Sequence, residues 1–400
     1  MKVLIIGGVV PYHQKLMEND IECILLTSKE HSNIVNLNLN YSSIHVLDYE
    51  LDSEEFINIA VSLHSQLNFD RVCAFHEQFQ KSALIISSLI GTPFIPEETI
   101  ELSLDKEKMR QVLRESGLDN TNSFKVENKN ELYCCYKKFT GPVIIKPVDG
   151  TASESVYKIN SYDEMVTISE KIFSKGRRSY IIEDFFHGDE YSIESFSERG
   201  NHKILAITEK IKYKNSFVEK AHIVPASLDK NSADQVVSFV KEVLTALKIN
   251  DGPSHLEIIL GPKGPMVVES HCRAGGDGIV RLLEDSLDID VLDLVAKQSV
   301  GMSVIDSIPD KPTYKCFSAV WFYDDILSGV IDKVEGVESA STSEDIKAVQ
   351  IMKKAGDVIN HIESSYDRVA CVFAVGSSRQ SVEDTSKSAL RKISFHCTEQ

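Results

Sequence analysis

Short apolar runs alternate with amphipathic stretches along the first hundred residues. The apolar runs predict buried strands at residues 2–7, 22–27, 43–48, 71–75 and 93–95. Between them, apolar side chains recur at helical spacing over residues 53–67 and 79–90. Strands that alternate with helices pack as a parallel sheet that is covered on both faces. The pattern therefore predicts a doubly wound α/β domain over residues 1–100.

The pattern changes after residue 100. A helix is predicted at residues 104–116, and Gly117 suits the left-handed turn that ends many helices. The next predicted elements are strands at 142–147, 179–186 and 190–196 and a helix at 161–174. They indicate a small α+β subdomain at about 121–196 that acts as a lid. A second sheet within residues 101–300 has its predicted elements at 203–210, 231–247 and 255–271.

Residues 301–400 predict a third α+β unit. Its strands are expected near residues 313–322 and 368–375, and its last helix at about 381–393. At 42% hydrophobic and 26% charged residues, the chain has the composition of a soluble globular protein. No internal repeat or low-complexity segment interrupts it. We therefore expect three folded units.

Charge and cysteine usage exclude several classes of partner. The formal net charge of −17 argues against a nucleic-acid surface and against docking on anionic lipid. No apolar run approaches the roughly 20 residues that a membrane helix needs. The start of the chain lacks the apolar length of a signal peptide, and the 8 cysteines lack CxxC spacing. We therefore expect a cytoplasmic protein with reduced thiols.

The hairpin predicted at residues 255–271 is the most informative segment. If its Gly-Pro-Lys-Gly-Pro turn is symmetric about Lys263, Glu257 lies directly opposite Glu269. The alternation of a strand then puts His255 and His271 on the same face. Two facing carboxylates repel each other, and a Mg²⁺ ion shared with substrate phosphates removes that conflict. The alternative, from these residues alone, is a surface hairpin whose acids point to water.

Two further segments favour a phosphate ligand. Lys146 lies in an apolar strand, and the small residues of the following loop, 148–153, offer backbone N–H groups to an anion. The alternative is a lysine that extends to the edge of its sheet. Arg273 is followed by Gly275 and Gly276, which allow the backbone to approach a ligand closely. Carboxylates, a metal and an arginine together suggest phosphoryl or acyl-phosphate chemistry.

Glu183 ends one apolar strand and Glu190 opens the next. Carboxylates there suit an adenine amino group and ribose hydroxyls, and the alternative is a solvated turn. In their order along the chain, the motifs resemble those of the ATP-grasp superfamily: Asp105-Lys106, Gly117, Lys146, Glu183, Glu190, Glu257, Glu269 and Arg273. The resemblance implies a Rossmann-like pre-ATP-grasp domain at 1–100, two α+β subdomains that grip ATP at 101–300, and a C-terminal α+β domain at 301–400.

The resemblance also implies roles for these residues. The ATP-binding residues would be Lys106 and Lys146 at the phosphates, Glu183 and the backbone through Phe185 at adenine, and Glu190 at ribose. Glu257 and Glu269 would hold Mg²⁺, and Arg273 would stabilise the transferring phosphoryl group and the acyl-phosphate. His271 stands where many members have asparagine. Because histidine is a poorer magnesium ligand, either two carboxylates hold the metal with water and phosphate, or Mn²⁺ is better tolerated.

Glu219 and His222 indicate which group of ATP-grasp enzymes the chain resembles. Their Glu-x-x-His spacing is similar to that of bacterial L-amino acid ligases of the bacilysin-synthesising type. This implies a homodimeric ligase that joins an amino acid carboxylate to an amine, with ATP cleaved to ADP and phosphate. The implied substrate-binding residues are Glu219, His222, Arg273, Gly275 and Gly276, of which His222 and Arg273 would be catalytic. From the residues alone, a histidine between apolar residues, such as His222, is more often a buried core residue.

Three alternatives stay open. Another ATP-grasp ligase, of purine-pathway or carboxylase type, would use the same ATP-binding residues. A non-catalytic ATP-binding regulatory protein would account for His271 and for the polar loop after Lys146. A dinucleotide-dependent oxidoreductase would require G-x-G-x-x-G after the first strand, where the chain has only Ile6-Gly7-Gly8.

Overall fold

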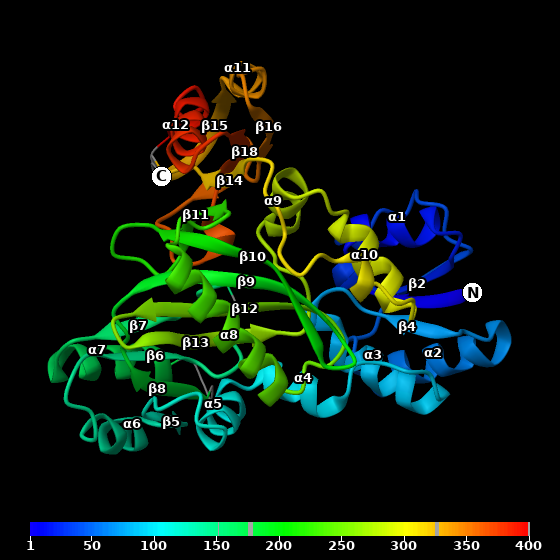
Figure 1. The fold of residues 1–400 in the computed structure, drawn as a ribbon, viewed down its shortest axis with the longest axis horizontal. Helices are drawn as coiled ribbons and strands as arrows, with labels where there is room; N and C mark the ends of the chain where they lie inside the picture. The colour runs from blue at the N-terminus through cyan, green and yellow to red at the C-terminus, as the bar shows by residue number, and fades with distance from the viewer. Residues whose placement is uncertain (151, 175–178, 325–327, 399–400) are drawn as a thin grey trace.

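The computed structural model describes residues 1–150, 152–174, 179–324 and 328–398 (Figure 1). The N-terminal domain holds a parallel sheet in the order β3-β2-β1-β4. Its strands are β1 (Lys2–Ile6), β2 (Glu22–Ser28), β3 (Ser43–Leu47) and β4 (Arg71–Cys73). The helical elements around it are α1 (Val10–Glu18), η1 (Lys29–Ile34), α2 (Glu54–Leu67) and α3 (Glu77–Ile90). The predicted parallel sheet with helices between its strands is confirmed.

The strand predicted at residues 93–95 is wrong. This segment lies between α3 and the next helix without pairing to β4. Pro93 and Pro96 cannot donate to a ladder, so only Phe94 and Ile95 between them carry backbone N–H groups. β4 is therefore the edge strand of the described sheet.

The helix predicted at 104–116 is present over residues 106–115, and a helix that was not predicted precedes it. α4 (Glu97–Leu104) ends at Asp105, and α5 (Lys106–Glu115) begins directly after it. The Asp105 side chain accepts hydrogen bonds from the backbone N–H groups of Glu107 and Lys108, and so caps α5. Gly117 takes a φ of +72°, as predicted for a residue that ends a helix. The cap at Asp105 fixes Lys106 on the first turn of α5.

The small subdomain is a four-stranded antiparallel sheet in the order β5-β8-β6-β7. Its elements are β5 (Ser123–Val126), α6 (Lys129–Tyr136), β6 (Val143–Pro147), β7 (Tyr157–Ile159), α7 (Tyr162–Phe173) and β8 (Tyr180–Asp184). The sequence analysis also placed residues 190–196 here. They lie in β9 instead, which pairs with strands of the larger sheet on both sides and has residues 191–197 buried there.

The larger sheet has eight strands, in the order β13-β12-β9-β10-β11-β14-β18-β16. The strands that precede residue 301 are β9 (Asp189–Glu198), β10 (Asn201–Lys212), β11 (Glu219–Val224), β12 (Gly252–Gly261) and β13 (Gly264–His271). Those that follow it are β14 (Phe317–Phe322), β16 (Ile346–Ile351) and β18 (Ala370–Gly376). The C-terminal unit therefore continues the sheet that carries the predicted site.

The other elements cover this sheet or extend it. The helical ones are α8 (Lys230–Ala246), α9 (Ile279–Ser286), α10 (Val291–Ser299), η2 (Ile305–Ser307), α11 (Val337–Ser341), η3 (Ser365–Asp367) and α12 (Arg379–Leu390). A further three-stranded sheet, in the order β17-β15-β19, consists of β15 (Gly329–Glu335), β17 (Val358–Ile359) and β19 (Ser394–Thr398). Figure 1 shows this sheet and α12 beside β14 and β18, far from the N-terminus.

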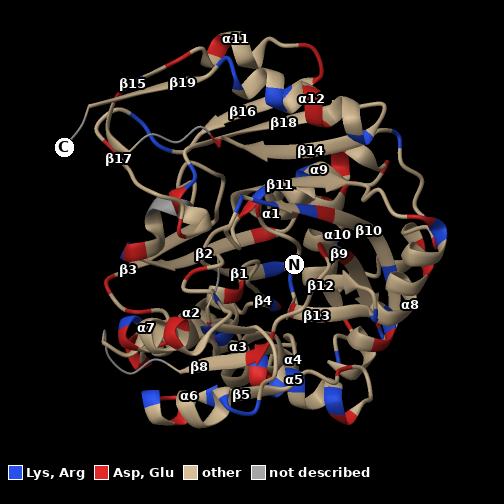
Figure 2. Cartoon of the chain, turned by 90° about the vertical axis from the view of Figure 1, so that its left-hand side faces the viewer, with Lys and Arg blue, Asp and Glu red and all other residues tan. Residues whose placement is uncertain are grey.

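One apolar core joins the N-terminal domain to the larger sheet. It contains Val3 and Leu25 from the N-terminal strands, Leu282 from α9, Val295 from α10 and Phe373 from β18. Its burial holds β4 beside the ends of β9 and β12. Lys and Arg residues are interspersed with Asp and Glu residues along most elements of the chain (Figure 2). Among the described helices, none combines the length and apolar character needed to cross a bilayer.

Candidate active site

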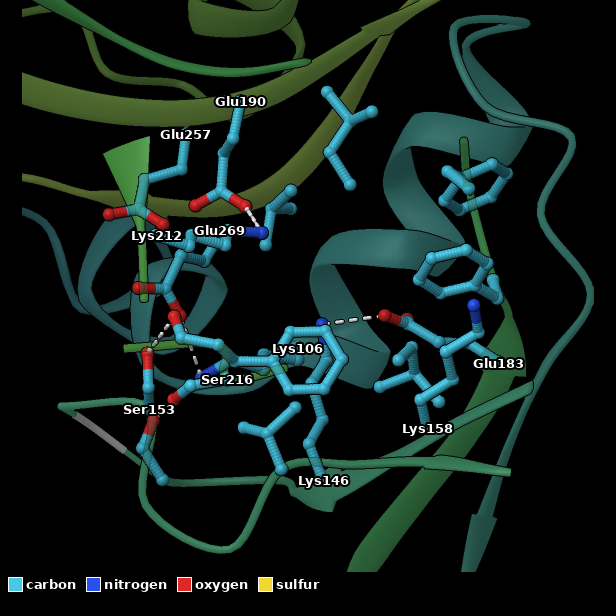
Figure 3. A pocket seen from close by; sticks show the side chains of 18 of the residues that line it. Lys106, Lys146, Ser153, Lys158, Glu183, Glu190, Lys212, Ser216, Glu257 and Glu269 are labelled. Carbon is cyan, nitrogen blue, oxygen red and sulfur yellow. Dashed lines mark hydrogen bonds and ion pairs between the residues drawn. The ribbon is translucent and has the colours of Figure 1, made fainter. Parts of the chain in front are cut away.

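A cavity of about 570 Å³ lies between the small sheet and the eight-stranded sheet (Figure 3). Its volume is within the range of roughly 300–1,000 Å³ that is typical of small-molecule sites. The predicted site residues that line it are Lys106, Lys146, Glu183, Phe185, Glu190, Glu257 and Glu269. Thr151, in the predicted phosphate loop, lies outside the described residues. The fold thus gathers into one cavity residues that are up to 163 positions apart (269 − 106).

Two buried lysines point into this cavity from different elements. The Lys146 Nζ atom is 2.6 Å from Glu183 Oε1, and the Lys106 Nζ atom is 3.1 Å from Glu269 Oε2. Lys106 also donates to the Gly150 carbonyl at 2.9 Å, which ties α5 to the loop after β6. Burial lowers the pKa of Lys146, although Glu183 opposes the shift. Removed from water, both ammonium groups are strong partners for an anion.

Glu183 is held from both sides. Lys146 contacts one oxygen of its carboxylate, and Arg110 Nε donates to the other at 3.2 Å. Burial alone raises the pKa of Glu183, but Arg110 and Lys146 more than offset this and the pKa falls below its usual value. The Phe185 N–H donates to the Pro142 carbonyl at 3.0 Å. The Glu183 side chain is therefore a fixed anion at one end of the cavity.

Sequence analysis did not single out Lys158, which lies at the same end. Its Nζ atom is 3.8 Å from the centre of the Phe185 ring. A lysine over an aromatic face is held by attraction to the ring quadrupole. Lys158 lies in the short strand β7, and its pairing with Ile144 brings it next to β6. No local signal distinguished it from other lysines of the chain.

The hairpin has the predicted register. Glu257 pairs with Glu269, and His255 pairs with His271, across β12 and β13. A bulge follows at Glu257/Ile258, so the match is lost closer to the turn. Burial alone raises the pKa of Glu269, but Lys106 and His271 hold that pKa well below its usual value. Facing carboxylates are thus kept charged by cations around them.

Lys210 is the residue that the sequence analysis most clearly missed. Its ammonium group forms ion pairs with three carboxylates, those of Glu190, Glu219 and Glu257. The Lys210 side chain is 1% exposed. Burial alone lowers the pKa of Lys210, but the three carboxylates raise it well above its usual value. Lys210 therefore remains charged and balances the acids that surround it.

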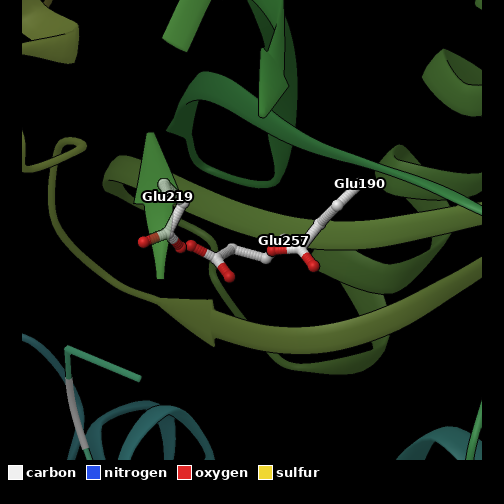
Figure 4. Close-up of side chains that lie close together, drawn as sticks. All are labelled: Glu190, Glu219 and Glu257. Carbon is white, nitrogen blue, oxygen red and sulfur yellow. The ribbon is translucent and has the colours of Figure 1, made fainter. Parts of the chain in front are cut away.

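These three glutamates form the group best placed to hold a metal ion. One oxygen from each lies within 4.8 Å of the oxygens of the other two (Figure 4). Carboxylate oxygens are the ligands that Mg²⁺ prefers. Glu257 belongs both to this group and to the facing pair with Glu269. The donor set therefore fits a hard divalent cation next to the cavity.

His271 and Arg273 share a partner, Glu77, that the sequence analysis did not identify. His271 Nδ1 is 2.9 Å and Arg273 Nε 2.5 Å from Glu77 Oε2. His271 Nε2 is also 3.1 Å from Glu269 Oε1. Burial lowers the pKa of His271, but its two carboxylate partners raise it above the usual value. In its protonated form the ring has no lone pair for a metal.

Arg273 does not line the cavity that holds the lysines. It lines a second cavity, at the junction with the N-terminal domain. Its Nη1 atom also donates to the Ala274 carbonyl at 2.9 Å. Of the two glycines beyond it, Gly275 has no room for a side chain, because a Cβ atom there would lie 2.8 Å from Glu194 Oε2. A Cβ at Gly276 would meet nothing within 4 Å.

Glu219 and His222 are brought together by an arginine from the C-terminal unit. Arg368 Nη2 is 3.0 Å from Glu219 Oε2, and Arg368 Nη1 is 2.8 Å from Asp277 Oδ2. His222 Nε2 is 3.4 Å from the same Asp277 oxygen. Burial raises the pKa of Asp277, but His222 and Arg368 outweigh it and hold that pKa far below its usual value. The Glu-x-x-His pair is therefore part of a buried polar network.

Comparisons with known proteins agree with this geometry. A family model described as an ATP-grasp domain matches residues 139–280, and one described as L-amino acid ligase C-terminal domain 2 matches residues 327–398. The crystal structure of an L-amino acid ligase from Bacillus licheniformis superposes with a TM-score of 0.86 at 20% identity, covering 100% of this chain and 99% of that one. At this identity the superposition establishes the fold.

Two curated relatives extend the comparison. The L-arginine-specific L-amino acid ligase of Bacillus subtilis is 21% identical over 89% of this chain and 87% of its own length. The uncharacterized protein y4rH of Sinorhizobium fredii is 24% identical over 74% of this chain. That match spans 62% of y4rH, less than two thirds of its length.

The two-sheet cavity lies in the part of the chain that the first family model matches. Residues 139–280 are similar to ATP-grasp domains, as the order of the motifs predicted. Residues 327–398 are similar to the C-terminal domain of L-amino acid ligases, and the fold follows one such ligase over the whole chain. The predicted fold class and the predicted resemblance are both confirmed.

Proposed function

We propose that this protein is an ATP-dependent ligase that joins an amino acid carboxylate to an amine, the amine of a second amino acid in the simplest case. The observation that carries the proposal is the cavity between the two sheets. It combines two buried lysines, Lys106 and Lys146, with the facing carboxylates of Glu257 and Glu269. A triphosphate requires such cations, and a hard metal ion requires such acids.

The cavity walls suggest how ATP lies in it. Lys106 and Lys146 bind phosphate oxygens, and they exchange part of their present pairing with Glu269 and Glu183 for the ligand. Glu183, which lies next to Lys146, accepts from the adenine amino group beside the Phe185 backbone. Glu190, which opens β9, binds the ribose hydroxyls. All five side chains line the same 570 Å³ cavity.

Glu257 and Glu269 are the proposed metal ligands, and Glu190 and Glu219 lie close enough to assist Glu257. Mg²⁺, or Mn²⁺ in its place, would neutralise negative charge that develops on the phosphates. The pairing of His271 with Glu77 and Glu269 supports a role in which this histidine orients Glu269.

The reaction has two steps. A carboxylate oxygen of the first substrate attacks the γ-phosphorus of ATP, the bond from that phosphorus to the bridging oxygen breaks, and ADP leaves. The neutral amine of the second substrate then attacks the acyl carbon, the carbon–oxygen bond to phosphate breaks, and the amine proton leaves to water or phosphate. An amide, ADP and phosphate are the products. Exclusion of water protects the acyl-phosphate.

The substrate residues lie beside this cavity. Glu219 grips an amino group, while His222 lies near the transferred phosphate. Arg273, followed by Gly275 and Gly276, approaches the acyl-phosphate after its guanidinium turns from Glu77. The Arg368–Asp277 pair, adjacent to His222, supports the placement of a charged substrate here. We further propose a homodimer in the cytoplasm.

A second candidate function has one observation in its favour. Arg273 pairs with Glu77 and does not line the 570 Å³ cavity. An ATP-binding regulatory protein without catalytic turnover would have no use for an arginine at the γ-phosphate. Measurement of turnover separates the two candidates.

The test measures ADP and phosphate release from ATP and Mg²⁺ with all pairs of the common amino acids, and identifies the products by mass spectrometry. The proposal requires turnover with particular pairs and a product lighter than the two substrates by one water. ATP binding without turnover on any pair would support the regulatory protein instead. Lys146→Met should abolish this turnover. Lys108→Met removes the charge of an exposed lysine on the same helix as Lys106 and should leave turnover unchanged.

A further inference from the structure

A second cavity, of about 410 Å³, lies where the N-terminal domain meets the eight-stranded sheet. One wall is β4, the edge strand, together with the unpaired segment at residues 93–96. The opposite wall comes from the ends of β9 and β12 and from α10 with the residues after it. Figure 1 shows these elements beside one another, away from the small subdomain. The two cavities share no lining residue.

Two arginines line this second cavity without a partner. Neither the Arg71 nor the Arg199 guanidinium forms a hydrogen bond or an ion pair with any described residue. Arg71 is half-buried, and Arg199 is exposed at the turn between β9 and β10. The planar guanidinium presents its donors in a fork that matches a carboxylate. The cavity therefore offers two unused binding groups for an anion.

The acids on the same wall are already engaged. Glu198 accepts from the Ser303 hydroxyl at 2.6 Å and from the Val304 N–H at 2.9 Å. These bonds, with a smaller contribution from Arg199, lower the pKa of Glu198. Asp251 accepts from the Arg199 backbone N–H at 2.9 Å. Both acids hold the wall in place through these bonds, whereas no described residue accepts from the guanidinium groups of Arg71 and Arg199.

The wall also makes room for one of the arginines. A Cβ atom at Gly301 would lie 2.5 Å from Arg71 Nη2, and Gly301 has a φ of +86°, so only glycine fits without strain. The remaining lining is largely apolar, with Val72, Phe94 and Val295 among its side chains. A ligand that matches both the arginines and the apolar lining has a carboxylate and an apolar body.

We propose that this cavity is a binding site for a small carboxylic acid with an apolar body, whose carboxylate is held by Arg71 and Arg199. The site is distinct from the nucleotide cavity. Its occupancy acts on the proposed reaction through Arg273, which lines the same cavity and is tied there to Ala274. The binding itself does not depend on the proposed ligase activity.

Calorimetry on the full chain, saturated with ADP and Mg²⁺, tests the proposal with two probes of equal shape. These are 3-phenylpropionate and its neutral amide, 3-phenylpropionamide. We expect the acid to bind and the amide to bind at least tenfold more weakly, because a charged hydrogen bond contributes about that factor or more. Equal affinity of acid and amide, or no binding of the acid, would overturn the proposal.

Variants locate the site. Arg71→Gln and Arg199→Gln should each weaken binding of the acid about tenfold or more, whereas Arg71→Lys should retain most of it. The control is Arg391→Gln, an exposed arginine in the C-terminal unit. Thermal unfolding of each variant without ligand checks that the fold is intact. If the two glutamine variants bind the acid as tightly as Arg391→Gln does, the assignment is refuted.

Discussion

Replacement of Lys210 by methionine would leave the carboxylates of Glu190, Glu219 and Glu257 without the cation that they share. Their nearest oxygens all lie within 4.8 Å of one another. At an effective dielectric constant near 20, two charges at that distance repel by about 3.5 kcal/mol. Removal of one partner from a buried ion pair costs roughly 3–5 kcal/mol. At about 2–4 °C per kcal/mol, we expect the unfolding temperature of Lys210→Met to fall by roughly 6–20 °C.

The loss should depend on pH in a definite direction. Glu190 and Glu257 have folded pKa values below their usual ones, so the stability they contribute in the wild type is present above their unfolded pKa and lost as pH falls through the folded pKa. Without Lys210 the repelling carboxyl groups are more easily protonated. The difference between variant and wild type should therefore be largest near pH 8 and smaller near pH 5. Differential scanning calorimetry at the two pH values measures it.

Divalent metal provides the second arm of this experiment. If the three oxygens can hold Mg²⁺, the ion should restore part of the lost stability, by about 2.7 kcal/mol at a hundredfold excess over its Kd. The wild type should gain less, because Lys210 competes with the ion. Lys108→Met is the matched control, since its ion pair with Glu101 is exposed and its loss should leave the transition unchanged. A Lys210→Met transition as stable as that of the wild type at pH 8 would refute the reasoning.

Three other predictions concern the hairpin and the residues after it. Arg273→Ala should reduce turnover by about 10²–10³-fold or more and change ATP affinity little, as steady-state kinetics and calorimetry would show; full activity would exclude it from the chemistry. Glu269→Gln should raise the concentration of Mg²⁺ needed for half-maximal turnover, and an unchanged requirement would remove it from the metal site. Burial lowers the pKa of His255, but Glu194 and Glu257 raise it to about 9. The wild type should therefore lose roughly 3 kcal/mol between pH 6.5 and 9, and His255→Asn should lose less in urea unfolding at these pH values.

The cap at Asp105 and the proline pair at residues 93 and 96 mark the limits of prediction from local pattern. The aspartate directly before α5 is a visible start signal and this helix was predicted, whereas α4 at residues 97–104 was not. At residues 93–96 two apolar side chains suggested a strand, although a ladder needs donors that proline lacks. At residues 93–96 the requirements of backbone hydrogen bonding overrode the hydrophobic pattern.

The sequence by itself determined the alternation of strands and helices, the facing pair Glu257 and Glu269, and the order of motifs along the chain. These follow from periods of two and about 3.6 residues and from a short turn, all of which are local properties. Only the tertiary structure decided which distant charges meet. Arg368 reaches Glu219 across 149 positions, and Glu77 reaches Arg273 across 196. The order of strands in a sheet depends on how the whole chain buries its apolar faces, so no local pattern encodes these contacts.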